Sequence, residues 1–519
     1  MRGLFKSISL VSGTTLISRV LGFVRDVTFA SFFGANFDFD AFLVAFKIPN
    51  FMRKLFAEGA FSQAFVPVLM SYYVQNSKED ALEFIDKVFG NLMLSLIILT
   101  LLVMLCAPYV VGLFAPGYLA FPLKFAITTK MLRITFPYAI FISLTAMIGA
   151  IYNCKKKFFF PALCPAILNI CSIICAYCSQ YYHGSIIFLA WGILIAGMLQ
   201  LGFLLFGMRS IQRKPRPKIS FKDKGVAEVV KLMSAALFGV SVSQIGMVID
   251  TFLASFLPSG SISWLYYSER LLNLPLALFA TAISTVMLPY LASCYAKKNN
   301  KEYNEKVDWG IRLIIVISLP AAVGLYVLAQ PILLTLFYHG NFTLLDVNMS
   351  SLSLCSFALG LPAFMLVKVT VGAFYARKDI KTPVKVAVYA LIVDIALSLI
   401  LFEPMAHAGL ALAVSVSAWF NGLWLFKILL NRGLLQLSHE TKKVFFVSAY
   451  SSLVMMILLK LLLPNLNVWV SYSTGARFLA TFMCIILSII IYAINLKLCG
   501  VKSWMFISGK QAANNFDIA

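Results

Sequence analysis

Eight charged side chains interrupt two otherwise apolar stretches near the start of the chain. They lie in the predicted helices 8–33 and 40–73. The eight residues are Arg19, Arg25, Asp26, Asp40, Lys47, Arg53, Lys54 and Glu58. Charges at membrane depth are costly, so they persist mainly where they face the interior of a helix bundle or a wet cavity. We therefore interpret the cluster as one wall of a polar cavity.

The balance of charge in this cluster predicts the kind of ligand. Five of the eight side chains are basic and three are acidic, and this surplus of positive charge favours an anionic substrate. At 100° per residue, Ser18, Arg19, Arg25 and Asp26 fall on one face of the first helix. Arginine can hold two phosphate oxygens in its planar fork. The alternative is that Arg25 and Asp26 pair for structural reasons alone or extend towards a membrane interface.

One pairing within the cluster and two basic side chains outside it qualify this interpretation. Lys54 and Glu58 are four residues apart on one helix and can pair, so Glu58 is either a ligand or an organiser of its neighbour. Arg270 is the clearest candidate in the second half of the chain to meet the arginines of the first half. Lys368 is a further candidate there.

Two acidic residues in apolar segments have no basic neighbour in the sequence. Asp250 and Asp394, together with the hydroxyl groups of Ser415 and Ser417, could form an oxygen-rich site for a monovalent cation such as Na⁺. Two alternatives stay open: one acid is protonated, or one pairs with Lys368. We expect no other cofactor.

Motifs of catalysis are absent from the sequence. It contains no HExxH, no phosphate-binding loop, no GxSxG and no paired aspartates of a metal-dependent prenyl or phosphate transferase. We therefore expect a protein that is not an enzyme. Because a nucleotide-binding motif is also absent, an ion gradient, the membrane potential or the supply of substrate must drive any transport.

The composition predicts a membrane protein. The 519 residues are 61% hydrophobic and 12% charged, whereas soluble domains are about 25% charged. The net charge of +22 comes from basic residues in short loops between apolar runs. That pattern reflects membrane topology and not nucleic-acid binding.

Fourteen apolar stretches reach the roughly 20 residues that a spanning helix needs. They are 8–33, 40–73, 88–114, 123–153, 160–179, 186–208, 227–256, 264–296, 309–337, 349–376, 383–402, 407–430, 443–463 and 475–498. Connections without Lys or Arg alternate strictly with basic ones, which predicts that both termini are cytoplasmic.

The chain also resembles itself at an offset of 222 to 224 residues. DVTFASFF from Asp26 matches DTFLASFL from Asp250, and Gly149–Pro161 matches Gly372–Pro383. We predict an all-α polytopic membrane protein with 14 transmembrane helices, in which two six-helix lobes are related by a pseudo-two-fold axis along the membrane normal. The predicted parts are an N-terminal lobe 1–208, a basic cytoplasmic linker 209–226, a C-terminal lobe 227–432, two extra helices in 433–498 and a cytoplasmic tail 499–519.

Several long motifs resemble the MviN/MurJ family of lipid II flippases, in the multidrug/oligosaccharidyl-lipid/polysaccharide exporter superfamily. They are SRVLGFVRD (18–26), DAFLVAFKIPNFMRKLFAEGAFSQAFVPV (40–68), GVSVSQI (239–245), ASFLPSGSISWLYYSERL (254–271) and DIKTPVK (379–385).

The resemblance implies a central cavity between the lobes and alternating access that moves lipid II, an undecaprenyl-pyrophosphate-linked disaccharide-pentapeptide, from the inner to the outer leaflet of the bacterial cytoplasmic membrane. It implies substrate-related roles for Arg19, Arg25, Arg53, Arg270 and Asp40. It also implies a lipid-tail groove in the last two helices and, in some members, a sodium site. We expect a monomer whose partners are lipid II and membrane lipids.

Two other functions on the same fold stay open. One is a flippase for another polyprenyl-linked oligosaccharide, which residue chemistry does not separate from lipid II. The other is an ion-coupled drug antiporter, which predicts an acidic or aromatic cavity for a cationic drug, contrary to the basic surplus.

Overall fold

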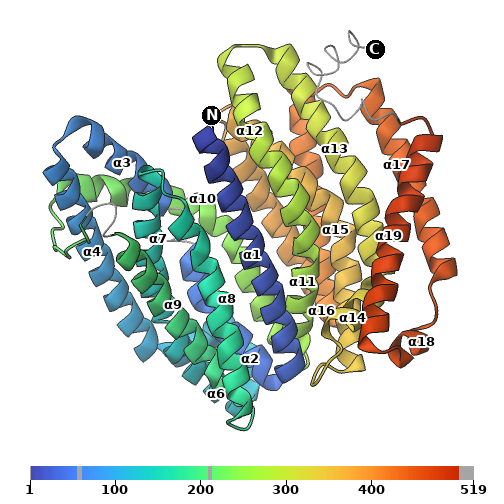
Figure 1. Cartoon of the computed structure of the whole chain (residues 1–519), viewed down its shortest axis with the longest axis horizontal. Coiled ribbons are helices and arrows are strands. Elements are labelled where there is room, and N and C mark those ends of the chain that lie inside the picture. Colours follow the sequence, from blue (N-terminus) through green and yellow to red (C-terminus); the bar gives the residue numbers. More distant parts are fainter. Residues whose placement is uncertain (1, 55–60, 209–212, 502–519) are drawn as a thin grey trace. The chain divides into compact units, whose positions relative to one another are not determined.

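The computed structural model describes residues 2–54, 61–208 and 213–501 (Figure 1). Every regular element in these ranges is a helix. The chain divides into two compact units. Unit 1 runs to Ser263 and includes His339–Phe342, and unit 2 holds Trp264–Tyr338 and the chain from Thr343 onward.

Unit 1 contains the helices that carry most of the predicted site. They are α1 (Arg2–Phe33), α2 (Phe37–Met52), α3 (Phe61–Gln75), α4 (Lys78–Leu105), α5 (Ala107–Phe114), η2 (Pro116–Ala120), α6 (Pro122–Thr135), α7 (Tyr138–Cys154), α8 (Phe159–Gln180), α9 (Ile187–Met208) and α10 (Lys224–Ala254). A core that includes Phe65, Phe84, Met147 and Leu204 joins α3, α4, α7 and α9.

Unit 2 begins at Trp264, within α11 (Ser261–Pro275). Its other helices are η3 (Leu276–Ala280), α12 (Thr281–Ala296), α13 (Asn300–Val327), α14 (Ala329–Phe337), α15 (Leu344–Ala376), α16 (Lys381–Asn431), α17 (His439–Leu462), α18 (Leu466–Ser471) and α19 (Thr474–Leu498). Leu291, Ile311, Leu361 and Leu425 belong to its main core.

The helices agree with the predicted spans, several of which are broken as their proline residues suggest. Ten helices in the described part are long and apolar enough to cross a membrane. The span predicted at 123–153 consists of α6 and α7, which separate at Pro137. Proline lacks the N–H that a helix interior requires, and its ring displaces the preceding turn. The all-helical membrane fold is thus confirmed, and the count of 14 is consistent with it.

Helix α16 contains two predicted spans. Its helical dihedral angles are interrupted at Ala406 (φ 47°, ψ −131°). The Ser417 hydroxyl donates to the Ala390 carbonyl at 2.6 Å, and a Cβ at Gly409 would lie 2.2 Å from the Leu401 carbonyl oxygen. Residues before and after Ala406 therefore lie side by side, and α16 is an antiparallel pair of helices with almost no connecting loop.

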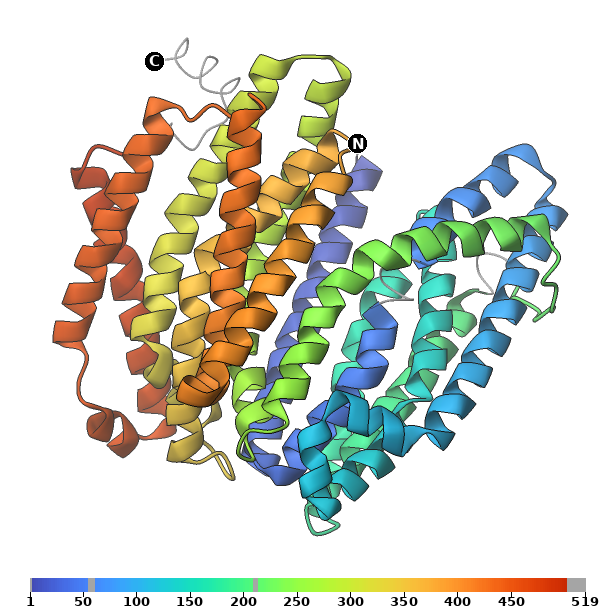
Figure 2. The ribbon, with the colours of Figure 1, turned by 180° about the vertical axis from the view of Figure 1, so that it is seen from behind.

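The boundary between the units differs from the one that the internal repeat predicts. The repeat places α10 at the start of the second lobe, whereas α10 packs against α3 within unit 1 (Figure 2). A repeat reports how two segments are related in sequence, and packing decides which compact unit holds a helix. The division into two six-helix lobes stays a prediction.

Candidate functional site

Arg25 and Asp26 form a buried ion pair on α1. The guanidinium of Arg25 donates to Oδ1 of Asp26 through Nε at 3.1 Å and Nη2 at 2.7 Å. Its Nη1 donates to Oδ1 of Asn169 on α8 at 3.0 Å. Arg25 is 7% exposed and Asp26 is 4% exposed. Because a buried charge without a partner is strongly destabilising, Asp26 and Asn169 fix the position of this cation.

Asn169 also holds the preceding turns of α1. Its amide Nδ2 donates to the backbone carbonyl of Ser18 at 2.9 Å. A Cβ at position 22 would approach the same Nδ2 to 3.4 Å, so Gly22 allows α8 to pack closely here. One side chain from α8 therefore connects the Ser18 turn of α1 to the Arg25 turn.

Ser18 and Arg19 line a pocket of about 450 Å³ within unit 1. Its other walls come from the end of α7 and the start of α8. They are Asn153, Phe158, Pro161, Ala162 and Pro165. Arg19 is exposed there, so its charge is available to a ligand. The predicted pairing of Arg25 with Asp26 is present, whereas Arg19 faces a pocket.

The charged residues of α2 are partly engaged with their neighbours. Lys47 donates to the Thr251 hydroxyl of α10 at 3.1 Å, and Nε of Arg53 donates to Oδ1 of Asn50 at 2.8 Å. Helix α2 begins at Phe37, three residues before the predicted start, and therefore includes Asp38. This additional acid makes the positive surplus of the charged cluster one charge smaller than predicted. Glu58 lies outside the described residues.

Asp40 is 1% exposed and accepts four hydrogen bonds. Its Oδ2 accepts from Nζ of Lys124 at 3.1 Å and from the backbone of Gly260 at 2.7 Å. Its Oδ1 accepts from the backbone and hydroxyl of Ser263 at 2.9 and 2.6 Å. The first backbone N–H groups of a helix lack partners within it. Asp40 therefore caps the start of α11 from another helix.

Lys124 is the cation that accompanies Asp40. It is 3% exposed, and its ammonium lies 4.4 Å from the ring centroid of Tyr118 and 5.2 Å from that of Phe37. It also donates to the Ser259 hydroxyl at 3.3 Å. With both charges buried, this pair organises the protein and leaves no open position on Asp40 for a ligand.

In unit 2, Arg270 is half-buried on α11. Its guanidinium carbon lies 4.7 Å from the ring centroid of Tyr266, and Nη2 donates to the Tyr266 hydroxyl at 3.3 Å. One turn of helix separates these two residues, so the aromatic ring holds the arginine by a cation–π contact. Lys368 is exposed on α15.

Asp250 belongs to unit 1 and Asp394 to unit 2. Asp250 is half-buried on α10, and Asp394 is 8% exposed on α16. Oδ1 of Asp394 and the hydroxyl oxygen of Ser398, one turn further along, are buried without hydrogen-bond partners. Such oxygens fit a bound monovalent cation or a proton. Among the described residues, no group of three or more His, Cys, Asp or Glu side chains could hold a metal ion.

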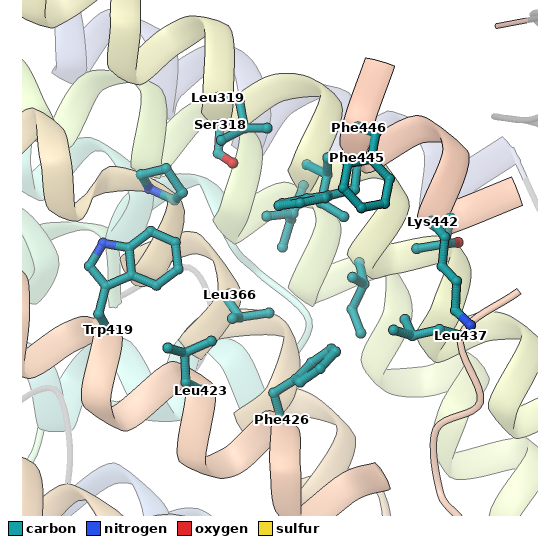
Figure 3. Close-up of a pocket in the computed structure, with 15 residues that line it drawn as sticks. Ser318, Leu319, Leu366, Trp419, Leu423, Phe426, Leu437, Lys442, Phe445 and Phe446 are labelled. Atoms are coloured by element: carbon teal, nitrogen blue, oxygen red, sulfur yellow. The ribbon is translucent and has the colours of Figure 1, made fainter. Parts of the chain in front are cut away.

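Unit 2 also contains an apolar pocket of about 430 Å³ (Figure 3). Leu319, Leu366, Trp419, Leu423 and Phe426 approach it from α13, α15 and α16, and Phe445 and Phe446 approach it from α17. Lys442 is the charged residue of its lining. None of the lining residues comes from α19, so this pocket differs from the predicted groove between the last two helices.

Comparison with known proteins decides the family. A family model described as "Lipid II flippase MurJ" matches residues 29–495. The chain belongs to the lipid II flippase MurJ family. It is 41% identical over 502 residues to the "Probable lipid II flippase MurJ" of Haemophilus influenzae, and the match covers 94% of this chain and 98% of that protein. It is 38% identical over 439 residues to the "Lipid II flippase MurJ" of Burkholderia cenocepacia, with 83% and 85% covered.

Solved structures agree with this family membership. A structure described as "Lipid II flippase MurJ, inward closed conformation" has a TM-score of 0.81 and 31% sequence identity, and it covers 94% of this chain and 98% of that one. A multidrug resistance MATE family transporter of the MOP superfamily has a TM-score of 0.65 at 12% identity and covers 82% of this chain. This second likeness shows the fold alone. The predicted family and the multi-pass membrane location are confirmed.

Sequence reasoning missed two residues that organise this site in the MurJ family member. Asn169 is a polar residue in an otherwise apolar helix, and such a side chain usually needs a hydrogen-bond partner on another helix. Lys124 lies just after a predicted outer connection that lacks basic residues. A single lysine at that end departs from the positive-inside pattern, and this departure makes it a candidate partner for a buried acid such as Asp40.

We predict that Asp40→Ala destabilises the protein by about 3–5 kcal/mol, because it leaves Lys124 buried without its partner. Thermal unfolding in detergent measures the loss. The double variant Asp40→Asn/Lys124→Gln should recover part of the stability, since neither charge then remains. Glu228→Gln, which removes an exposed acid of α10, is the control and should have little effect. A normal unfolding temperature for Asp40→Ala would contradict the capping role and favour a direct contact with substrate.

Proposed function

We propose that this protein moves lipid II from the inner to the outer leaflet of the bacterial cytoplasmic membrane by alternating access. Membership of the lipid II flippase MurJ family supports this function. One structural observation connects this function with particular residues. On α1, Arg19 opens into a pocket two helical turns from Arg25, whose guanidinium is held by two buried partners.

The proposed binding mode follows from charge. The pyrophosphate and sugar headgroup is the part that a bilayer excludes, and cations at membrane depth offset the cost of moving its negative charge. Arg19 and Ser18 contact the headgroup directly. Arg25 and Asp26 offset each other's charge, and their pair positions this face of α1. Arg53 and Arg270 provide further cations during the cycle, and Glu58 acts through Lys54. Asp40 is a positioning residue.

The alternatives have less support from the residues described. A drug antiporter for cations requires an acidic or aromatic pocket, whereas Arg19 brings a cation to the pocket on α1. A flippase for another polyprenyl-linked oligosaccharide has the same charge requirement and is separated from lipid II transport by the family. The protein acts as a monomeric transporter without enzymatic activity or nucleic-acid binding, and both termini are cytoplasmic.

The central test measures lipid II on each leaflet of cells that depend on this protein. We predict that Arg19→Gln reduces outward exposure of lipid II by roughly tenfold or more, because a hydrogen bond to a charged group contributes about 1.5–3 kcal/mol. Arg25→Gln should also reduce it, because the change leaves Asp26 buried without its ion-pair partner. Lys130→Gln is the control, since Lys130 is an exposed lysine of α6 outside this pocket. Membrane expression must be equal in all variants. Unchanged exposure in cells that lack the protein and any redundant flippase would refute the function itself.

We further propose that the apolar pocket beside α17 receives part of the polyprenyl tail. Its lining is mostly aliphatic and aromatic, and it lies between membrane helices (Figure 3). Leu423→Trp fills the pocket and should weaken binding of lipid II with its full tail, but not of an analogue with a short prenyl chain. Binding is measured by native mass spectrometry. Leu430→Trp, an exposed position on the same helix, is the control. Equal weakening of both ligands would contradict a tail site.

We also propose that unit 2 binds a sodium ion. Asp394 and Ser398 would hold it through their buried oxygens, with the Ser417 hydroxyl oxygen as a neighbouring ligand. We predict that NaCl raises the unfolding temperature relative to KCl at equal ionic strength, and that Asp394→Asn and Ser398→Ala each remove this difference. Glu403→Gln, an exposed acid of α16, should preserve it. A sodium-specific shift that survives in Asp394→Asn would exclude this site.

A further inference from the structure

The chain between α9 and α10 is bound along α4. Residues 213–224, RKPRPKISFKDK, are called the linker segment here. The backbone N–H of Arg216 donates to Oδ1 of Asp86 at 2.7 Å, and that of Lys218 donates to the Asp86 carbonyl at 3.1 Å. Asn91 and Ser220 exchange two hydrogen bonds at 2.8 and 3.0 Å. The linker segment is therefore fixed to a helix over several residues.

Side chains anchor both ends of the linker segment. Nη2 of Arg213 donates to Oδ2 of Asp86 at 2.6 Å, and Asp86 is 1% exposed. Nζ of Lys87 donates to Asp223 at 2.8 Å. Burial opposes ionisation of Asp223, but the hydrogen bonds from Lys87 and from the backbone of Val226 hold its pKa below the usual value. Nζ of Lys218 also lies 3.6 Å from Oε1 of Glu83. These ion pairs explain the docking, and they leave Lys214, Arg216, Lys222 and Lys224 to be accounted for.

The docking point on α4 coincides with a change in composition. The helix carries six charged residues from Lys78 to Lys87 and none from Val88 to Leu105. Asp86 and Asn91 lie on either side of this boundary. In a helix that crosses a bilayer, the boundary between charged and apolar residues lies near the membrane surface. The linker segment is therefore held at the depth of the lipid headgroups.

Two large apolar side chains of the linker segment are exposed. Ile219 is 61% exposed and Phe221 is 64% exposed. In extended chain, residues two apart point to the same side, and the docked Ser220 lies between them. The segment contains six basic residues and one acidic residue. Its basic residues Lys214, Arg216, Lys218, Lys222 and Lys224 are exposed.

We propose that the linker segment is a membrane-surface anchor that binds anionic phospholipids. Ile219 and Phe221 insert among the upper acyl chains, and the exposed lysine and arginine side chains contact lipid phosphates. Basic residues next to a membrane helix are attracted to anionic lipid surfaces, and aromatic side chains favour the interface. An acidic protein partner would satisfy the charges, but it does not explain why the exposed apolar pair lies at the depth where the apolar part of α4 begins.

The test uses the full chain with Phe221→Trp, reconstituted in vesicles of phosphatidylcholine with or without phosphatidylglycerol. Tryptophan emission is compared with that of the unsubstituted chain, and the lipids carry bromine either near the headgroup or deep in the acyl chain. We expect quenching of the added indole by shallow bromine more than by deep bromine, and stronger quenching when phosphatidylglycerol is present. High salt should reduce the effect of phosphatidylglycerol, because it screens exposed charges.

Matched charge variants show whether the attraction to anionic lipid comes from the linker segment or from the basic residues of the protein in general. Lys214→Gln/Lys222→Gln should remove most of the phosphatidylglycerol dependence, whereas Lys297→Gln/Lys301→Gln, two exposed lysines where α12 ends and α13 begins, should preserve it. Circular dichroism and gel filtration confirm that each variant is folded. An added indole that emits as in water and is unquenched by every brominated lipid would overturn the proposal and favour a protein partner. Quenching that is equal in both lipid mixtures would overturn the preference for anionic lipid.

Discussion

Buried charge must be neutralised within the protein, and much of unit 1 is arranged around this requirement. Three helices and one loop meet at the carboxylate of Asp40, which no single element could satisfy alone. Lys124 supplies the opposite charge, and the start of α11 supplies N–H groups that would otherwise lack acceptors. An ion pair without solvent gains little net stability over apolar packing, but losing one partner is expensive. The pair therefore fixes how α2, α6 and the start of α11 fit together.

The same requirement separates the two arginines of α1. The charge of Arg25 is neutralised by Asp26, and its guanidinium is held in place by Asn169. Arg19, six residues earlier, is exposed and lines a pocket. Because Asn169 contacts both the Ser18 turn and the Arg25 turn, a movement of α8 against α1 would change both positions together. The helix thus carries one cation for structure and one for contact.

The sequence was sufficient to predict an all-helical membrane fold, because the spans are long, apolar and bounded by charged or proline-containing segments. It also indicated Arg19 and Arg25 as members of one helical face. It was insufficient for contacts between distant segments. Nothing in the spacing of Asp40 shows that its partners are Lys124 and Ser263, which are 84 and 223 residues away. Likewise, the repeat relates α10 to α1 in sequence, but packing against α3 is decided by side-chain shape and places α10 in the first unit.

The turn at Ala406 constrains how the chain can be probed. The two halves of α16 reverse direction around a single residue with positive φ, and Gly409 lies so close to Leu401 that a Cβ there would collide with its carbonyl oxygen. A reversal this tight has no spare chain, so a tag or protease site inserted here would disturb the packing of the two halves. Reporter fusions at this turn would describe a damaged protein and not its topology.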